Sequence, residues 1–156
     1  MAELYPFIKW LHVIGAAVII GTGLGTAFHF WLTMRREGAA AIAAAGRSTV
    51  LADWLFTLPA VVLQPLTGLA LARIAGYPLT QTWIVGAAAL YVLTGACWIP
   101  VVFIQQRLRD LAEESARSAT ALPPEFHRLA RIWVALGWPA FLAMAATVWL
   151  MIARPA

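Results

Sequence analysis

Histidine is the residue type in this chain best suited to chemistry, because imidazole binds metals and exchanges protons near neutral pH. The chain has three histidines, His12, His29 and His127. His12 and His29 fall on the same predicted helix, roughly 25 Å apart along its axis and on faces that differ by about 100°. They therefore cannot bind one metal ion together, and a metal or haem site must use them separately.

Small residues follow His12 by one helical turn, at Gly15 and Ala16. Two interpretations fit this spacing. The small residues could leave room for a flat macrocycle, in which case His12 is an axial ligand of haem. They could equally admit a neighbouring helix, in which case His12 hydrogen-bonds across the interface. The GxxxG pair of Gly21 and Gly25 has the same two interpretations, close helix packing or a groove for a haem face.

The composition indicates what must position these residues. Of 156 residues, 62% are hydrophobic and 12% are charged, and the mean hydropathy is +0.79. Soluble domains carry about 25% charged residues, so an ordinary soluble domain and a disordered chain are both excluded. Cys97 is the single cysteine, which excludes an intramolecular disulfide. The sequence predicts one domain of an integral membrane protein.

Four apolar stretches are long enough to cross a bilayer, which takes roughly 20 residues. They span about 5–34, 50–74, 82–106 and 132–152. We therefore predict an all-α fold, an integral membrane four-helix bundle that forms a single transmembrane domain over residues 1–156. The alanine-rich segment 38–46 is expected to form a small helical turn or loop. Residues 107–119 are expected to form a cytoplasmic amphipathic segment that extends the third helix or lies at the membrane interface.

Positive charge is distributed unevenly between the connections. The first and third connections carry eight arginines, whereas the opposite side carries only Lys9, Arg73 and Arg154. Because loops rich in Lys and Arg stay in the cytoplasm, we predict both termini outside, in a bacterial inner (plasma) membrane. This topology accounts for a net charge of only +4, so nucleic acid is not an expected partner.

The cytoplasmic end carries a second candidate site. His29 near the end of the first span and His127 just before the fourth lie on the same side, where they could share a haem iron. Arg35, Arg128 and Arg131 could contact haem propionates there. The alternative is that these side chains anchor the helices at the membrane interface.

Two further residues in the spans bear on function. Met144 is expected at a depth similar to that of His12, which makes it a candidate second axial ligand, with ordinary packing as the alternative. Asp53 opens the second span, where it suits the helix dipole. We expect it to pair with Arg47 or to orient His29.

Proline interrupts the second span near its middle. Pro65 frees the carbonyl group of Val61, and we expect Thr67 or Gln64 to satisfy the displaced polar groups. Gln64 is also a candidate contact for a quinone or a substrate. The chain contains no Walker loop, dinucleotide fingerprint, HExxH, CxxC or GxSxG motif, and the sequence assigns no catalytic residue.

Several short motifs resemble a bacterial family of predicted integral membrane proteins with a domain of unknown function. They are IKWLH from residue 8 with the glycine-rich stretch that follows, DW at 53, QPLTG from 64, ACWIPVV from 96 and LGWP from 136. The resemblance covers nearly the whole chain, and it implies the four-span fold.

A more distant similarity links the chain to HemJ-type protoporphyrinogen oxidases and CopD-type membrane proteins. Both place a lysine three residues before a histidine in the first helix, matching Lys9 and His12. The similarity to the HemJ type implies that His12 binds haem b. The HemJ type has a second important lysine in a later helix, and spans two to four here contain none. What the similarity implies is therefore haem or porphyrin binding.

The leading hypothesis is a b-type haem protein that transfers electrons with a membrane quinone or another redox partner. Such a protein could be a haem-dependent membrane oxidoreductase. The alternatives are a non-catalytic accessory or assembly subunit, and a CopD-like protein for permeation of a metal or small molecule. The expected partners are the lipid bilayer, a quinone, and a homo-oligomer or larger membrane complex.

Overall fold

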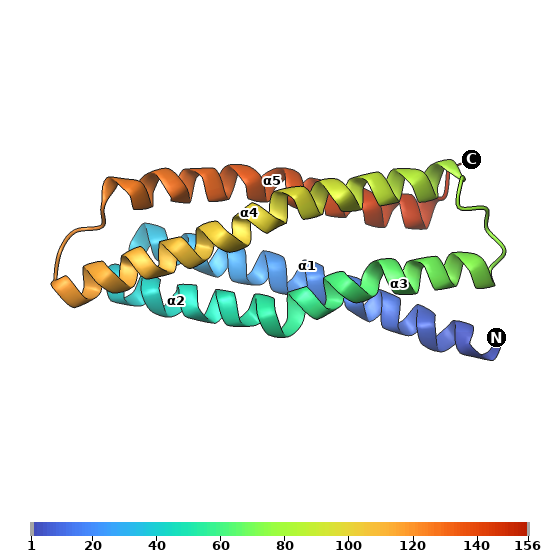
Figure 1. The fold of residues 1–156 in the computed structure, drawn as a ribbon, viewed down its shortest axis with the longest axis horizontal. Coiled ribbons are helices and arrows are strands. Elements are labelled where there is room, and N and C mark those ends of the chain that lie inside the picture. Colours follow the sequence, from blue (N-terminus) through green and yellow to red (C-terminus); the bar gives the residue numbers. More distant parts are fainter. Residues whose placement is uncertain (1, 156) are drawn as a thin grey trace.

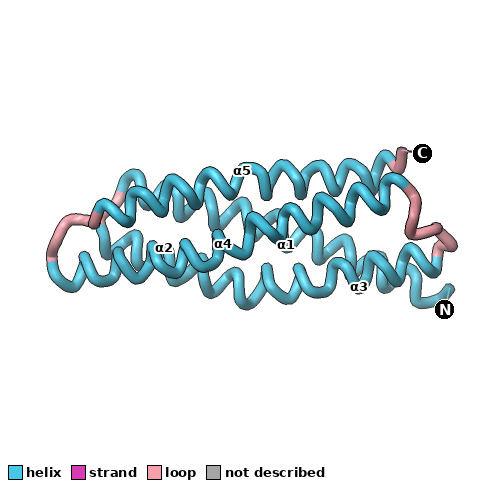
Figure 2. Tube along the Cα trace, turned by 45° about the horizontal axis from the view of Figure 1, so that its top comes forward, coloured by secondary structure: helices cyan, strands magenta, loops and turns pink. Residues whose placement is uncertain are grey.

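The computed structural model describes residues 2–155 as an elongated bundle of helices (Figures 1 and 2). No strand occurs within this range. In chain order the elements are η1 (Ala2–Leu4), α1 (Tyr5–Arg36), α2 (Ala39–Ala52), η2 (Asp53–Thr57), α3 (Leu58–Ile74), α4 (Thr82–Ser118) and α5 (Pro124–Ala153). Four helical segments are long and apolar enough to cross a membrane, with Ala39–Ile74 forming one of them. The predicted all-α membrane bundle is confirmed.

The two ends of the bundle differ in the chain segments and in the number of arginines that lie there. Both termini and the α3–α4 loop lie at one end, which we call the terminal end (Figure 1). The α1–α2 turn and the α4–α5 loop lie at the other, which we call the arginine-rich end because most of the arginines flank these connections. The predicted orientation, with the arginine-rich end in the cytoplasm, stays a prediction.

The alanine-rich segment is part of a regular helix from Ala39 onward, so the expectation of only a small helical turn or loop over 38–46 was wrong. Only Glu37 and Gly38 separate α1 from α2, which begins at Ala39. Alanine is the strongest helix former, and one side of α2 packs along α4, which stabilises the helix further. Residues 107–118 likewise continue α4 without a break.

The second span changes its helical pitch at η2, a π-helical turn. The amide of Leu58 donates to the carbonyl of Asp53, five residues back. Pro59 follows directly, and proline has no amide hydrogen to donate within a helix. The wider turn therefore falls next to the residue that interrupts the regular hydrogen-bond ladder. Turns of this kind are often found at functional sites.

The densest packing lies at the arginine-rich end. Phe30, Leu108 and Phe126 are almost fully buried there, and the rings of Phe30 and Trp133 meet edge to face with centroids 5.6 Å apart. The 32 residues of α1 span roughly 48 Å, against about 30 Å for the hydrocarbon core of a bilayer. The helix is thus longer than the hydrocarbon core is thick, so it must tilt within the bilayer or extend past the lipid.

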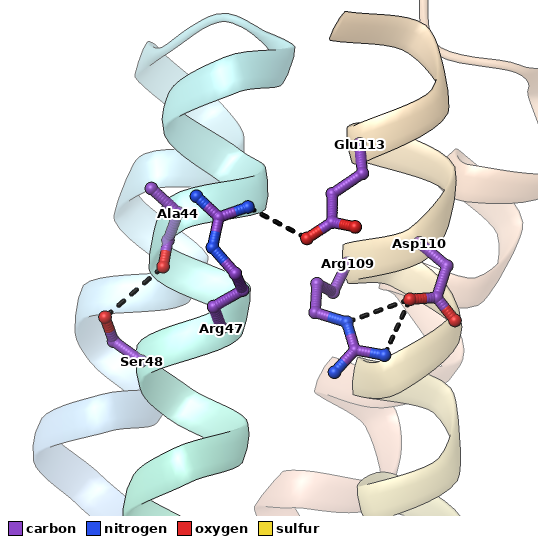
Figure 3. A network of polar contacts seen from close by, with 6 residues as sticks. All are labelled: Ala44, Arg47, Ser48, Arg109, Asp110 and Glu113. Atoms are coloured by element: carbon purple, nitrogen blue, oxygen red, sulfur yellow. Dashed lines mark hydrogen bonds and ion pairs between the residues drawn. The ribbon is translucent and has the colours of Figure 1, made fainter. Parts of the chain in front are cut away.

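Ion pairs join the helices on the surface of the arginine-rich end. Arg47 of α2 reaches Glu113 of α4 at 2.8 Å (Figure 3), so the expectation that Arg47 pairs with Asp53 was wrong. Arg107 and Glu125 join α4 to α5 at 2.9 Å across the intervening loop. The hydrogen bond from Arg107 holds the pKa of the Glu125 carboxyl below its usual range, so this contact persists until the pH falls through that lowered pKa.

Aromatic side chains secure the terminal end. The guanidinium of Arg154, just after α5, donates to the hydroxyl of Tyr77 at 2.8 Å and lies over the rings of Tyr77 and Trp83. Tyr and Trp are enriched at membrane interfaces because one part of each ring is apolar and another is polar. These contacts fasten the end of α5 to the α3–α4 loop.

Gly46 of α2 lies against the backbone of α4, and it gives a test of this packing. A Cβ atom at Gly46 would lie 2.9 Å from Cβ and 3.3 Å from Cα of Arg109, atoms that move only with the α4 backbone. We expect Gly46→Ala to lower the free energy of unfolding by about 1–3 kcal/mol. The measurement is thermal unfolding of the purified protein in detergent.

Gly23→Ala in α1 is the matched control, because nothing lies within 4 Å of the Cβ that it would add. Alanine gains up to about 1 kcal/mol over glycine in helix propensity, so this variant should be neutral or stabilised. Equal effects of the two substitutions would contradict the packing described for α2 and α4.

Candidate functional site

His12 lies at the interface between α1 and α3, and Thr67 fixes its ring. His12 Nδ1 is 2.7 Å from Thr67 Oγ1, and the same hydroxyl is 2.8 Å from the carbonyl oxygen of Leu63. A threonine hydroxyl has one hydrogen, which it donates to that carbonyl, as helical threonines commonly do. The Nδ1–H of His12 is then the donor to Thr67. Nε2 is left with a free lone pair, which can accept a hydrogen bond or bind a metal.

Two glycines allow the polar side chains to enter this interface. A Cβ atom on Gly68 of α3 would lie 3.3 Å from Cε1 of His12, and one on Gly15 of α1 would lie 3.6 Å from Cδ of Gln64. Each glycine therefore accommodates a side chain from the opposite helix. The sequence left two interpretations of Gly15, room for a macrocycle or room for a neighbouring helix. In the structure a neighbouring helix lies there, and His12 hydrogen-bonds across that interface. We call His12, Gln64 and Thr67 the α1–α3 polar site.

Gln64 contributes an unpaired polar atom to the α1–α3 polar site. Its Oε1 is buried and has no hydrogen-bond partner among the described residues. Buried polar atoms are paired in the great majority of cases, so an exception calls for a specific explanation such as a ligand or an ordered water. The site therefore combines Nε2 of His12 on α1 with the unpaired amide oxygen of Gln64 on α3, one helical turn before Thr67.

Pro65 does free the carbonyl of Val61, but the partner of that carbonyl was predicted wrongly. Tyr91 of α4 donates its hydroxyl to the Val61 carbonyl, whereas the hydroxyl of Thr67 bonds within its own helix. Sequence reasoning missed Tyr91. The signal for it is a phenolic hydroxyl in the middle of an apolar span, because such a group needs an acceptor inside the bilayer.

Asp53 belongs to a second buried polar group, again with a partner that was not predicted. Its carboxylate accepts a hydrogen bond from Nε2 of Gln105 in α4. The Oε1 of Gln105 lies 3.4 Å from Nε1 of Trp133 in α5, which donates to it. The expected contacts of Asp53 with Arg47 and His29 do not form.

The chain of hydrogen bonds from Asp53 through Gln105 to Trp133 joins the π turn to α4 and α5. The hydroxyl of Thr57 is also buried on η2, and it has no hydrogen-bond partner among residues 2–155.

The comparison with protein families agrees with this membrane architecture. The model of the family described as "Predicted integral membrane protein (DUF2269)" matches residues 6–155. The chain belongs to this family. A search of curated proteins and a search of solved structures each found no match. The family resemblance drawn from the sequence motifs is therefore confirmed, and the similarity to HemJ-type and CopD-type proteins stays a prediction.

The other candidate ligands of this DUF2269 member lie apart from the α1–α3 polar site. His127 is exposed on α5 and lines a groove with Trp31 and Arg35, whereas His29 is exposed and does not line that groove. No cluster of three or more His, Cys, Asp or Glu side chains suited to a metal ion occurs in the described part of the chain. A shared ligand role for His29 and His127 stays a prediction.

Arg128 is exposed on α5, and Arg131 lines the same groove as His127. Met144 is partly buried on α5, a helix that packs mainly against α4, whereas His12 contacts α3. The pairing of Met144 with His12 as haem ligands is likewise untested and stays a prediction.

The contact between Tyr91 and Val61 can be tested with a double-mutant cycle. Tyr91→Phe removes the donor, and we expect a loss of about 1 kcal/mol in the free energy of unfolding, typical of hydrogen bonds between membrane helices. Pro65→Ala restores an amide hydrogen that can bond the Val61 carbonyl within α3. The loss caused by Tyr91→Phe should therefore shrink in the Pro65→Ala background. Equal losses in both backgrounds would mean that Tyr91 does not compensate for the proline.

Proposed function

We propose that this membrane protein binds haem b through His12 and transfers electrons with a membrane quinone or another redox partner. The observation that carries the proposal is the hydrogen bond between His12 Nδ1 and Thr67 Oγ1. Histidines that bind a metal through one ring nitrogen almost always donate the other N–H to a neighbouring group. Thr67 provides that acceptor, and the lone pair of Nε2 is the one that would bind iron.

The surroundings of His12 fit a haem ligand in two further ways. Gly68 lets the imidazole lie against the α3 backbone, so its ring is held in place before any ligand binds. His12 also lies within an apolar span, where the bilayer makes an ionisable residue costly and therefore a candidate for function. Haem b, when bound, would supply one-electron chemistry, and this chain would supply the ligand and its orientation.

Distances along α1 limit which other residues can serve the same haem. Arg35 lies about 35 Å from His12 along the helix axis, so Arg35 cannot contact the propionates of a haem bound at His12. His29 is about 25 Å away and could not hold the same haem. Met144, as the sequence suggests, or another group or water would then hold the haem from its other side.

The proposal predicts a haem spectrum that depends on His12. Protein expressed with ample haem should show the reduced-minus-oxidised bands of a b-type cytochrome. The pyridine haemochrome assay should measure about one haem bound at this site per chain. His12→Ala should abolish or shift those bands because the axial nitrogen is gone. A colourless wild-type protein would overturn the proposal, and loss of the bands in His127→Ala instead would place the haem at the arginine-rich end.

The role of Thr67 is tested separately. Thr67→Val removes the acceptor for Nδ1–H, so we expect the affinity for haem to fall by about 10–100-fold, the range typical of such partners. Thr26→Val is the matched control, because the Thr26 hydroxyl makes the same type of bond to the carbonyl four residues back but contacts no histidine. Equal haem loss in the two variants would contradict the assigned role of Thr67.

A specific observation also supports a second candidate function, an accessory subunit of a larger membrane complex. Gly21, Gly23 and Gly25 have nothing within 4 Å of the Cβ that each would carry. The GxxxG pair therefore makes no close helix contact inside the chain, although such pairs favour helix association in membranes. A colourless protein that elutes with a stable partner, and loses it on Gly21→Leu and Gly25→Leu, would favour this function over haem binding.

A further inference from the structure

A groove opens between α1 and α5 at the arginine-rich end, far from the α1–α3 polar site. It has a volume of about 510 Å³ and is lined by Trp31, Met34, Arg35, Phe126, Arg131 and Val134, among others. A second hollow shares Trp31 and Arg35 and extends along α1 to Phe28. The combined surface has arginines at its rim and aromatic and aliphatic side chains along its walls.

Of the eight arginines at this end, three form ion pairs within the described residues and five do not, and both arginines that line the groove belong to the second group. Arg47, Arg107 and Arg109 each form an ion pair with a carboxylate. Arg35 and Arg131 have no such partner among residues 2–155, and no acidic residue lines the groove. Positive charge is therefore unneutralised on both sides of one hollow.

The local contacts hold these two guanidinium groups near the groove. Arg35 lies over the ring of Trp31 at 5.2 Å from its centroid, and Nε of Arg131 donates to the carbonyl of His127 at 3.4 Å. Both interactions leave other guanidinium N–H groups free, and a phosphate accepts pairs of such donors from arginine. The groove is thus suited to a phosphate at its rim.

The apolar walls identify the kind of molecule that carries this phosphate. Trp31, Met34 and Val134 are partly exposed and would gain nothing from a small soluble anion, but they suit a hydrocarbon chain. Phe28, one turn from Trp31, is 58% exposed and continues the apolar surface toward the middle of the span. Basic pockets between helices at a membrane surface bind anionic lipid headgroups. The observations therefore favour an amphiphile over a free phosphate.

We propose that Arg35 and Arg131 bind the headgroup phosphate of an anionic phospholipid whose acyl chain lies along Trp31, Met34 and Val134. The groove lies at the opposite end of α1 from His12, so this inference does not depend on haem binding. The sequence suggested haem propionates as the groups that Arg35 and Arg131 contact. The proposal assigns them a lipid phosphate instead.

The test measures lipid binding to the purified full-length protein in detergent by native mass spectrometry. The probes are phosphatidylglycerol and phosphatidylcholine with identical acyl chains, and inorganic phosphate alone. We expect phosphatidylglycerol to bind at least tenfold more tightly than phosphatidylcholine. The double variant Arg35→Gln and Arg131→Gln should weaken phosphatidylglycerol binding by about tenfold or more, since each arginine near an anionic surface contributes roughly a factor of five.

A matched control removes the same charge from the same end outside the groove, with Arg47→Gln and Arg117→Gln. Its affinity for phosphatidylglycerol should stay within twofold of the wild type. A loss equal to that of the groove variant would mean that the attraction is diffuse, which overturns the proposal. Inorganic phosphate that binds as tightly as the lipid would also overturn it, because the apolar walls would then contribute nothing.

A second variant keeps the test valid if the double arginine variant does not fold. Val134→Trp fills the groove without changing any charge and should weaken phosphatidylglycerol binding by about as much. Helix content by circular dichroism and the elution volume identify variants that are correctly folded. A folded Val134→Trp protein with unchanged lipid affinity would place the lipid elsewhere and contradict the proposal.

Discussion

Polar groups inside a bilayer have no water to bond, so each must find a partner within the protein. This requirement determines how the helices of this bundle are joined. His12 and Thr67 connect α1 to α3, and Tyr91 connects α4 to the carbonyl that Pro65 frees in α3. The chain from Asp53 through Gln105 to Trp133 connects η2, α4 and α5. Together these four hydrogen bonds link α1, α3, α4 and α5.

Apolar packing stabilises the bundle to different extents along its length. Between lipid tails, contact between two leucines is no more favourable than contact with lipid, so specific fit and hydrogen bonds determine which helices associate. Where helices extend into water, the hydrophobic effect acts again. The largest buried apolar side chains of residues 2–155, among them Phe30, Leu108 and Phe126, gather at the arginine-rich end. Apolar burial is therefore concentrated in one part of the bundle.

The sequence predicted the number of spans, the helical class and the family, because apolar length and short motifs are local properties of the chain. It did not predict the partners of its polar residues. Asp53 bonds Gln105 and Arg47 bonds Glu113, since both choices depend on the rotation of α4, which no local pattern records. Helix α2 begins earlier than expected because alanine favours a helix and because α2 packs along α4, a contact with residues more than sixty positions away. The sequence singled out His12 as a haem ligand, which stays a prediction, and its bond to Thr67 could be found only from the structure.

The uneven distribution of contacts has a mechanical consequence. At the arginine-rich end α2 packs along α4 and ties the two halves of the chain together. Toward the terminal end the main contacts are within the pairs α1–α3 and α4–α5, and the pairs separate in Figure 1. Buried packing is therefore extensive at one end and sparse at the other, where the hydrogen bonds of Tyr91 with Val61 and of Arg154 with Tyr77 join the two pairs. His12 lies in the α1–α3 pair toward the sparsely packed end, so a change in the spacing between the pairs near it would cost little core packing.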